Sequence, residues 1–205
     1  MNWLRHHDSG GDARGDGGEA ASGAIEEHRS PGLKVALTGA AARPGCRVLD
    51  LGPVVPANVA FLARFASHVS IADLSEDDGG GPGTHHWRGR LAFAVGSFDL
   101  VLVWDYLNRL DRREARDLVD RLRSVTRAGA VLFLLIHEAP EMPARPVKYE
   151  ILGEETIRYR PADGGSVAAP TILPAEVGRM LAGFRVDASF LLRHGVREYV
   201  AVRAV

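Results

Sequence analysis

The sequence predicts an α/β fold built on a mostly parallel sheet. Two apolar runs, 98–104 and 130–136, have the length and the unbroken hydrophobicity of strands that are covered on both faces. Segments with helical spacing follow most of the strand-like runs, so strand and helix alternate along the chain. The connections are short, which favours right-handed crossovers within one sheet.

Composition limits the range of functions. The chain has 205 residues, of which 46% are hydrophobic, enough for one domain with a sizeable core. A net charge of -1 favours neither nucleic acid nor a membrane surface, because both attract a concentrated positive field. The sequence shows no signal peptide and no membrane-spanning run, and Cys46 is its single cysteine. We therefore expect a soluble, cytoplasmic protein.

Residues 1–30 are expected to form a flexible N-terminal tail. They contain six glycines and, apart from Trp3, Leu4 and Ile25, little that could be buried. Trp3 and Leu4 are either a docking segment for a partner or ordinary surface residues. The folded domain is expected to cover 31–205, with an inserted segment at about 142–167.

The first part of the domain is predicted to be a strand, helix, strand unit. A short helix begins at Pro31, and "RVLDL" (47–51) is a buried strand. A helix follows because apolar residues recur at helical spacing, namely Val59, Leu62, Ala63 and Ala66. "HVSIADL" (68–74) is typical of a second strand, with Asp73 at its carboxyl end.

The middle of the chain is predicted to be a central strand and a long helix. The segment from Leu74 to Ser97 has only 24 residues, too few for a complete crossover, so we expect a shortened strand near 90–93 or none. After the central strand, Asp111 and Glu114 have the spacing of a helix start, and Gly129 is the expected stop. The predicted buried stripe of this helix is Ala115, Leu118, Val119, Leu122 and Val125.

The last third departs from the alternating pattern. "YEILGEETIRY" (149–159) predicts two short strands around Gly153 inside the insertion. Pro174 then opens a helix that carries Val177, Met180 and Leu181. The final segment, 185–205, predicts a hairpin around "HG", which makes the last strand antiparallel to its neighbour.

These parts together resemble a known family. "VLDLG" (48–52), an acid ending the next strand, "FDLVLVWDYLNRL" (98–110), "AGAVLFLLI" (128–136) and a terminal hairpin are similar to the class I S-adenosylmethionine-dependent methyltransferases over 31–205. The resemblance implies a Rossmann-like, doubly wound sheet of six to seven mostly parallel strands with an antiparallel terminal strand. It also implies S-adenosylmethionine as cofactor and methyl transfer to an unknown small-molecule or protein acceptor.

The resemblance places the cofactor over the carboxyl ends of the first strands. Asp50 and Gly52 match the family's first motif, and Asp73 matches the acid that holds the ribose hydroxyls, which a carboxylate can do by accepting two hydrogen bonds. The alternative for Asp73 is that it caps a turn before Ser75. The predicted cofactor-binding residues are Asp50, Gly52, Asn58, Asp73, Trp104 and Asp105.

The catalytic candidates are Asp105, Tyr106 and His137. Asp105, Tyr106 and Asn108 lie where the family places residues around the methyl group and the acceptor. His137 leaves the fifth strand at the ligand edge of the sheet and, like Glu138, can act as a base. The alternatives are structural: Asp105 begins a turn, Tyr106 packs, and His137 and Glu138 are satisfied loop residues.

The glycine-rich motif itself is degenerate. The positions after Gly52, where the family has further glycines, hold Pro53, Val54, Val55 and Pro56. Proline has no amide donor, and a valine forced to positive φ would cost about 1–2 kcal/mol. We therefore carry two hypotheses: a working methyltransferase, or a catalytically inactive domain that binds a protein partner through its insertion and tail.

Other chemistries have little support. Trp87, in "GTHHWRGRLAF", either stacks on the adenine in place of the family's acid or anchors a loop. His85 and His86 are adjacent and have no Cys or acid cluster to complete a ligand set, so no metal site is predicted. The motifs of hydrolases, phosphate-binding loops and dinucleotide-binding enzymes are missing from the sequence.

Overall fold

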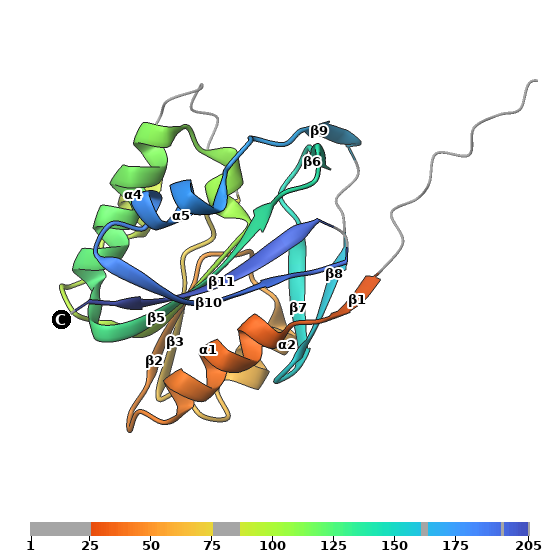
Figure 1. Ribbon diagram of the computed structural model, residues 1–205. Helices are drawn as coiled ribbons and strands as arrows, with labels where there is room; N and C mark the ends of the chain where they lie inside the picture. The colour runs from red at the N-terminus through yellow and green to blue at the C-terminus, as the bar shows by residue number, and fades with distance from the viewer. Residues whose placement is uncertain (1–25, 76–86, 161–163, 194, 205) are drawn as a thin grey trace, which may run out of the picture.

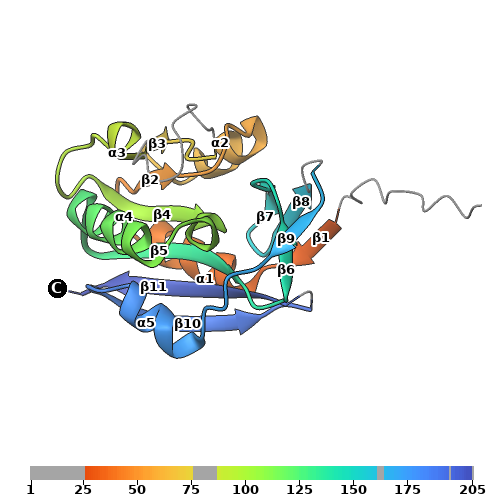
Figure 2. The same cartoon turned by 90° about the horizontal axis from the view of Figure 1, so that it is seen from above.

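A computed structural model describes residues 26–75, 87–160, 164–193 and 195–204. Figures 1 and 2 show the arrangement of these residues. Most of the predicted tail lies outside the described residues, as do His85 and His86. Within the described part, Glu26–Arg29 form strand β1, so the end of the predicted tail is structured instead.

The main sheet has six strands in the order β10-β11-β5-β4-β2-β3. Its strands are β2 (Arg47–Asp50), β3 (His68–Ile71), β4 (Phe98–Trp104), β5 (Thr126–His137), β10 (Phe184–Leu191) and β11 (Val196–Arg203). β3, β2, β4 and β5 are parallel to one another, and β11 runs antiparallel between β5 and β10. The predicted fold class and the terminal hairpin are confirmed.

Helices cover both faces of this sheet (Figure 2). They are α1 (Pro31–Ala41), α2 (Pro56–Leu62), α3 (Trp87–Arg90), the 3-10 helix η1 (Tyr106–Arg109), α4 (Arg112–Val125) and α5 (Pro174–Met180). Alternate residues of β4 enter two cores: Val101 and Val103 pack with α4 and α5, whereas Leu100 and Leu102 pack with α1 and α2. This burial on both faces explains why the strand is apolar from Leu100 to Trp104.

The insertion forms a second layer at the carboxyl end of the main sheet. Its strands are β6 (Glu141–Pro143), β7 (Lys148–Gly153), β8 (Thr156–Arg160) and β9 (Ser166–Ala168). β7 and β8 pair around Gly153 as predicted, and β1 pairs with the free side of β8. Figure 2 shows this three-stranded sheet standing beyond the arrowheads of β4 and β5. The insertion is thus placed beside the ligand edge of the fold.

One local prediction is narrowed and another is corrected. Of the two alternatives for 90–93, the described chain agrees with the second: residues 87–90 form the short helix α3, and no described strand lies between β3 and β4. Helix α4 ends at Val125 without a glycine, because the Thr126 hydroxyl bonds to the carbonyl of Leu122 at 2.8 Å. Gly129 lies inside β5, where its φ of +70° accommodates an irregularity in the pairing with β4.

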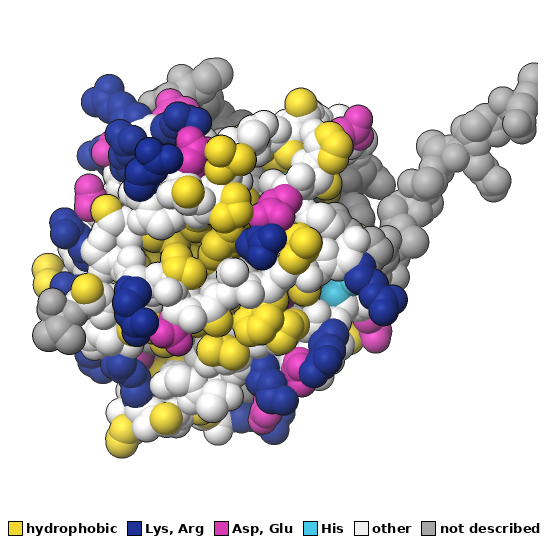
Figure 3. Space-filling model, viewed as in Figure 1, with side chains coloured by type: hydrophobic (Ala, Val, Ile, Leu, Met, Phe, Trp, Pro, Cys, Tyr) yellow, Lys and Arg dark blue, Asp and Glu magenta, His cyan; other side chains and the backbone are white. Residues whose placement is uncertain are grey.

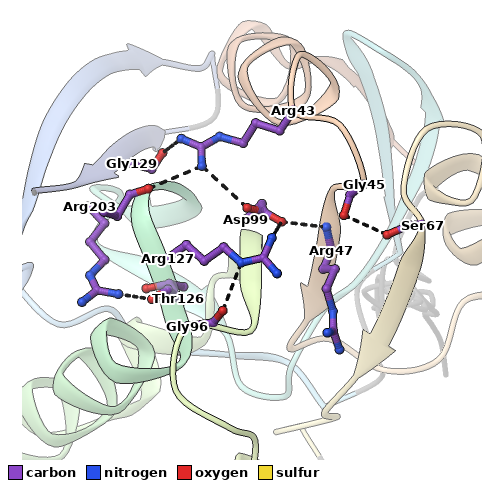
Figure 4. Close-up of polar contacts among 11 residues, drawn as sticks. Arg43, Gly45, Arg47, Ser67, Gly96, Asp99, Thr126, Arg127, Gly129 and Arg203 are labelled. Carbon is purple, nitrogen blue, oxygen red and sulfur yellow. Dashed lines mark hydrogen bonds and ion pairs between the residues drawn. The ribbon is translucent and has the colours of Figure 1, made fainter.

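An ion cluster fixes the opposite, amino-terminal edge of the sheet (Figure 4). The buried carboxylate of Asp99, at the start of β4, lies 2.9 Å from Arg127 and 3.6 Å from Arg43, and it accepts the backbone N–H of Arg47 at 3.0 Å. These contacts join the amino ends of β2, β4 and β5. They are structural and lie away from the predicted site.

The exterior is mixed in character. On the face in Figure 3, hydrophobic side chains gather near the centre, with lysine and arginine side chains around them. No helix in the described ranges is long and apolar enough to cross a membrane.

Candidate functional site

Four polar side chains lie at the carboxyl ends of the four parallel strands, which are adjacent in the order β3, β2, β4 and β5. Asp50 and His137 are the last residues of β2 and β5. Asp73 and Asp105 come just after β3 and β4. From β2 the chain goes to β3 on one side of β2 and then crosses to β4 on the other side. The strand order therefore reverses at β2. Ligands of open α/β sheets bind at such a point.

Trp104 covers the predicted cofactor surface at Gly52. Its indole Nε1 donates a hydrogen bond of 2.7 Å to Oδ1 of Asp50, which also accepts the backbone N–H of Gly52 at 2.9 Å. A Cβ atom on Gly52 would lie 2.9 Å from the indole ring. Glycine is therefore required at this position by the close approach of Trp104 itself.

The backbone of Trp104 is strained. Its φ of +54° is the one positive value among the described non-glycine residues. A side chain in this conformation costs about 1–2 kcal/mol, so the surrounding contacts must compensate for it. One such contact is a parallel stack with Tyr149 of the insertion, with ring centroids 5.0 Å apart. The insertion thus holds the indole over Gly52.

The degenerate turn causes less disturbance than the sequence suggests. Val54 is 63% exposed, so it does not fill the space above Gly52, and Val55 has an extended backbone, with φ at -117°. Neither valine is forced to positive φ. Pro56 occupies the first turn of α2, where no amide donor is needed. The obstruction at this surface is Trp104, not the valines.

Burial changes the chemistry of Asp50. The side chain is almost fully buried, and this desolvation raises its pKa from 3.8 to about 6, although the hydrogen bonds from Trp104 and Gly52 oppose the shift. Asp50 is therefore a carboxyl group whose charge is costly in this arrangement.

Asn58 fixes the insertion to helix α2. Its side-chain amide donates to the carbonyl of Tyr149 at 2.9 Å and accepts the N–H of Ile151 at 2.7 Å. The buried side chain also contacts Asp50, where its hydrogen bond opposes the raised pKa of the carboxyl group. The structure thus joins β7 to α2 through Asn58, and the predicted contact of this residue with the cofactor stays a prediction.

Asp73 caps a turn but keeps an oxygen for a ligand. Its Oδ1 accepts the N–H and the hydroxyl of Ser75, at 2.9 and 2.5 Å. No described residue donates to Oδ2, and Arg90 binds the backbone carbonyl of Asp73 at 2.7 Å. The two interpretations of this residue are therefore compatible, because turn and ligand use different atoms.

Asp105 and His137 form a buried pair between β4 and β5. Nε2 of His137 lies 3.6 Å from Oδ2 of Asp105, and the side chains are 8% and 5% exposed. Arg109 lies 3.1 Å from the same carboxylate oxygen and also binds the carbonyl of Arg145 in the insertion. Asp105 is thus oriented by a cation on one side and faces an imidazole on the other.

Asn108 holds this pair in place. Its side-chain amide donates to the carbonyls of Asp105 and Leu135, at 2.8 and 2.9 Å, while its carbonyl oxygen accepts the N–H of His137 at 2.9 Å. It therefore joins the end of β4 to the end of β5. Its role is to position the pair.

Two predicted aromatic contacts belong to the protein core. Tyr106 is 8% exposed and packs with the α4 side of the sheet, and burial raises the pKa of its phenol to about 12. Trp87 is 3% exposed and packs in the same cluster. Trp87 thus begins α3 with its side chain in the core, and Tyr106 lies in the other core from Trp104.

A cavity of about 190 Å³ lies between the end of β5 and the insertion. His137 lines it together with Tyr149, and the rest of its lining is mostly apolar. Gly52 and Asp73 are not among the lining residues. Because Tyr149 stacks on Trp104, these two rings stand between the surface of Gly52 and the cavity.

Sequence reasoning missed two contributors, Tyr149 and Arg109. Tyr149 gave no signal, because its partner Trp104 is distant in sequence and belongs to another layer. Arg109 did give a signal in the sequence, since it follows Asp105 at the i, i+4 spacing of helical ion pairs. No group of three potential metal ligands occurs in the described ranges.

Comparisons with known proteins identify the fold. No family model matches the sequence. No curated protein matches it either. Among solved structures, an S-adenosylmethionine-dependent methyltransferase from Mesorhizobium loti matches with a TM-score of 0.54 and 18% identity, over 84% of this chain and 96% of that one.

Two further structures have defined ligands. The 1,6-didemethyltoxoflavin-N1-methyltransferase of Burkholderia thailandensis, solved with its acceptor and S-adenosylhomocysteine, gives a TM-score of 0.52 and 16% identity over 85% of this chain and 77% of that one. An amino pentose methyltransferase from Micromonospora echinaspora, solved with S-adenosylmethionine, gives a TM-score of 0.51 and 21% identity over 85% of this chain and 90% of that one. This chain therefore has the fold of the class I S-adenosylmethionine-dependent methyltransferases.

Proposed function

We propose that this chain is an S-adenosylmethionine-dependent methyltransferase-like protein that acts on a small molecule. One observation carries the proposal: Asp73, Asp50, Asp105 and His137 form a row along the ligand edge of a methyltransferase fold, and the row ends at a cavity. The two neighbours with defined substrates, which methylate a didemethyltoxoflavin and an amino pentose, support a small acceptor.

The residues fit the cofactor unequally at its two ends. At the ribose end, Oδ2 of Asp73 accepts no hydrogen bond within the described residues and can receive one from a ribose hydroxyl. At the amino-acid end, the indole of Trp104 lies on Gly52 and must leave before a ligand can contact that backbone. S-adenosylmethionine, when bound, supplies an electrophilic methyl group.

On the acceptor side, the pair of Asp105 and His137 is suited to general-base chemistry. The carboxylate of Asp105 lies 3.6 Å from one ring nitrogen of His137, and both side chains are buried at the end of the sheet. Asn108 and Arg109 fix the two partners. We assign to His137 the removal of a proton from the acceptor. Asp105 orients the imidazole of His137.

Calorimetric titration with S-adenosylhomocysteine tests the cofactor site. Asp73→Ala is expected to weaken binding at least several-fold, because a hydrogen bond to a charged group contributes about 1.5–3 kcal/mol. Ser75→Ala is the matched control, since it removes the hydroxyl hydrogen bond of the turn but leaves the backbone N–H bond and the carboxylate. Equal losses in the two variants would assign Asp73 to the turn alone.

The same titration addresses the inactive alternative, a binding module for a protein partner. The cover of Trp104 over Gly52 is the observation that favours it. If neither the natural chain nor a variant without the indole binds S-adenosylhomocysteine at millimolar concentration, the enzyme proposal fails. A cytoplasmic setting is part of the proposal, and it is supported by the single cysteine, Cys46, which is buried and has no second cysteine for an intrachain disulfide.

A further inference from the structure

The size of the cavity suits a ligand of about one ring. Its volume is about 190 Å³. An apolar cavity of about 150 Å³ in another protein is known to bind benzene. A benzene ring with one or two small substituents therefore fits.

The walls of the cavity favour a flat, apolar ligand. Tyr149 and Tyr159 form an aromatic wall with ring centroids 6.4 Å apart, and His28 stacks on Tyr159 at 4.9 Å. Leu135, Ile157 and Val196 supply aliphatic surface. Pockets of this composition bind aromatic compounds, which a few polar groups then orient.

His137 is the polar group with an unused nitrogen. Its Nε2 is closed off from solvent, turned to Asp105 and without a hydrogen-bond partner in the described chain. Nδ1 has no described partner either but is not closed off, so it is the nitrogen that a ligand can reach. A neutral imidazole nitrogen accepts a hydrogen bond from a hydroxyl.

Charge around the cavity disfavours an anionic ligand. Glu141 belongs to the lining, whereas the charge of Asp105, behind His137, is paired with Arg109. A carboxylate ligand would meet the negative charge of Glu141. A neutral hydroxyl meets no such penalty.

We propose that the cavity binds a single-ring aromatic compound with a hydroxyl group, a phenol, whose hydroxyl donates to His137. This inference rests on the proposed function, since it names the class of the acceptor. The group that binds in the cavity is then also the group from which His137 removes a proton.

Binding of three small probes to the full chain tests this inference. The probes are 4-methylphenol, the isosteric 4-fluorotoluene, which lacks the donor, and 4-methylbenzoate, which is anionic. We expect 4-methylphenol to shift the NMR methyl signals of Leu135, Ile157 and Val196 and to bind about 2- to 10-fold more tightly than 4-fluorotoluene, the range for one hydrogen bond. Tighter binding of 4-methylbenzoate would overturn the assignment.

Two variants locate the binding. His137→Phe keeps a ring but removes the acceptor, so the two neutral probes should bind it equally. His68→Phe is the control, because His68 is an exposed histidine at the start of β3, and it should preserve the preference. Val196→Phe adds a ring at the partly exposed rim of the cavity and should weaken all probes at least tenfold.

The failures can be told apart. If no probe binds, or if Val196→Phe binds the probes as tightly as the natural chain, the cavity is not the site and the inference is wrong. S-adenosylhomocysteine is titrated into the same samples. If it binds while the probes do not, the inference fails and the proposed function stands. If the probes bind while neither the natural chain nor a variant without the indole of Trp104 binds S-adenosylhomocysteine, the cavity is a phenol site and the cofactor assignment fails.

Discussion

Nε1 of Trp104 lies 2.7 Å from Oδ1 of Asp50, and this hydrogen bond crosses the backbone at Gly52. One residue of the central strand thereby covers the turn where the fold family holds its cofactor. The same indole stacks on Tyr149, so the closure of this surface depends on the insertion as well as on β4. The closure by Trp104, the burial of Asp50 and the packing of the insertion and α1 can each be tested by substitution.

Removing the indole should open the cofactor surface. Trp104→Gly deletes the ring that lies on Gly52 and suits the positive φ of this position. We expect the affinity for S-adenosylhomocysteine to rise at least tenfold by calorimetry. Loss of the large buried side chain should cost stability, about 3–5 kcal/mol less the 1–2 kcal/mol of relieved strain, so chemical denaturation must first show that the variant is folded.

Val54→Gly is the control for that experiment. It restores a glycine to the turn, but Val54 is mostly exposed and covers nothing, so affinity should change less than twofold. A gain in Val54→Gly equal to that in Trp104→Gly would make the turn sequence, and not the indole, the barrier.

Asp50 should give stability a distinct pH dependence. Because burial raises its pKa from 3.8 to about 6, its contribution is fully present below about pH 4 and is lost as the pH rises through 6. Asp50→Asn removes this titration, so its stability relative to the natural chain should increase by roughly 2–3 kcal/mol between pH 4 and pH 7. Urea denaturation at several pH values measures the difference. For Asp120→Asn, a change at an exposed acid, the difference should stay flat.

Asn58 should stabilise the insertion. Asn58→Ala leaves the carbonyl of Tyr149 and the N–H of Ile151 without their buried partners, which should cost about 2–4 kcal/mol. Amide hydrogen exchange should accelerate at Ile151. Val59→Ala, a truncation of a half-buried side chain on the same helix, provides the comparison and should leave exchange at Ile151 nearly unchanged.

Two glycines of α1 should respond to alanine with opposite signs. At Gly32 a Cβ would lie 2.9 Å from Cβ of Glu198, a fully buried residue that binds Ser30 and the N–H of Gly32, so Gly32→Ala should destabilise the protein. At Gly39 the nearest atom is a methyl of Val131 at 3.6 Å, an ordinary contact. Gly39→Ala should therefore stabilise by up to about 1 kcal/mol through helix propensity. Thermal unfolding measures both, and equal signs would contradict the packing at Gly32.

Much of the fold follows from local patterns. The β4 and β5 strands were predictable because they are apolar over lengths that suit a covered strand, and α4 because Asp111 and Glu114 form a reciprocal cap. Gly129 was misleading, because the turn from helix to strand is closed by Thr126, whose hydroxyl bonds back to the preceding turn. A rule based on neighbouring residues cannot distinguish a glycine that ends a helix from a glycine at a strand irregularity.

The site was predictable to the extent that strand ends determine it. Asp73, Asp50, Asp105 and His137 follow parallel strands, and the carboxyl ends of such strands share one edge, so their alignment required only the strand order. The use of each side chain was a separate matter. Asn58 lies on the helix that a cofactor would approach, yet its amide binds a segment 91 residues away.

The sequence by itself determined the α/β class, the strands that end at the ligand edge and the acids placed there, because hydrophobic periodicity and capping act over a few residues. Only the tertiary structure decided that Trp104 lies on Gly52, that Tyr149 holds it there and that β1 joins the insertion. These contacts join layers distant in the chain, and they depend on one strained φ and on the direction of single rings, which no local pattern specifies.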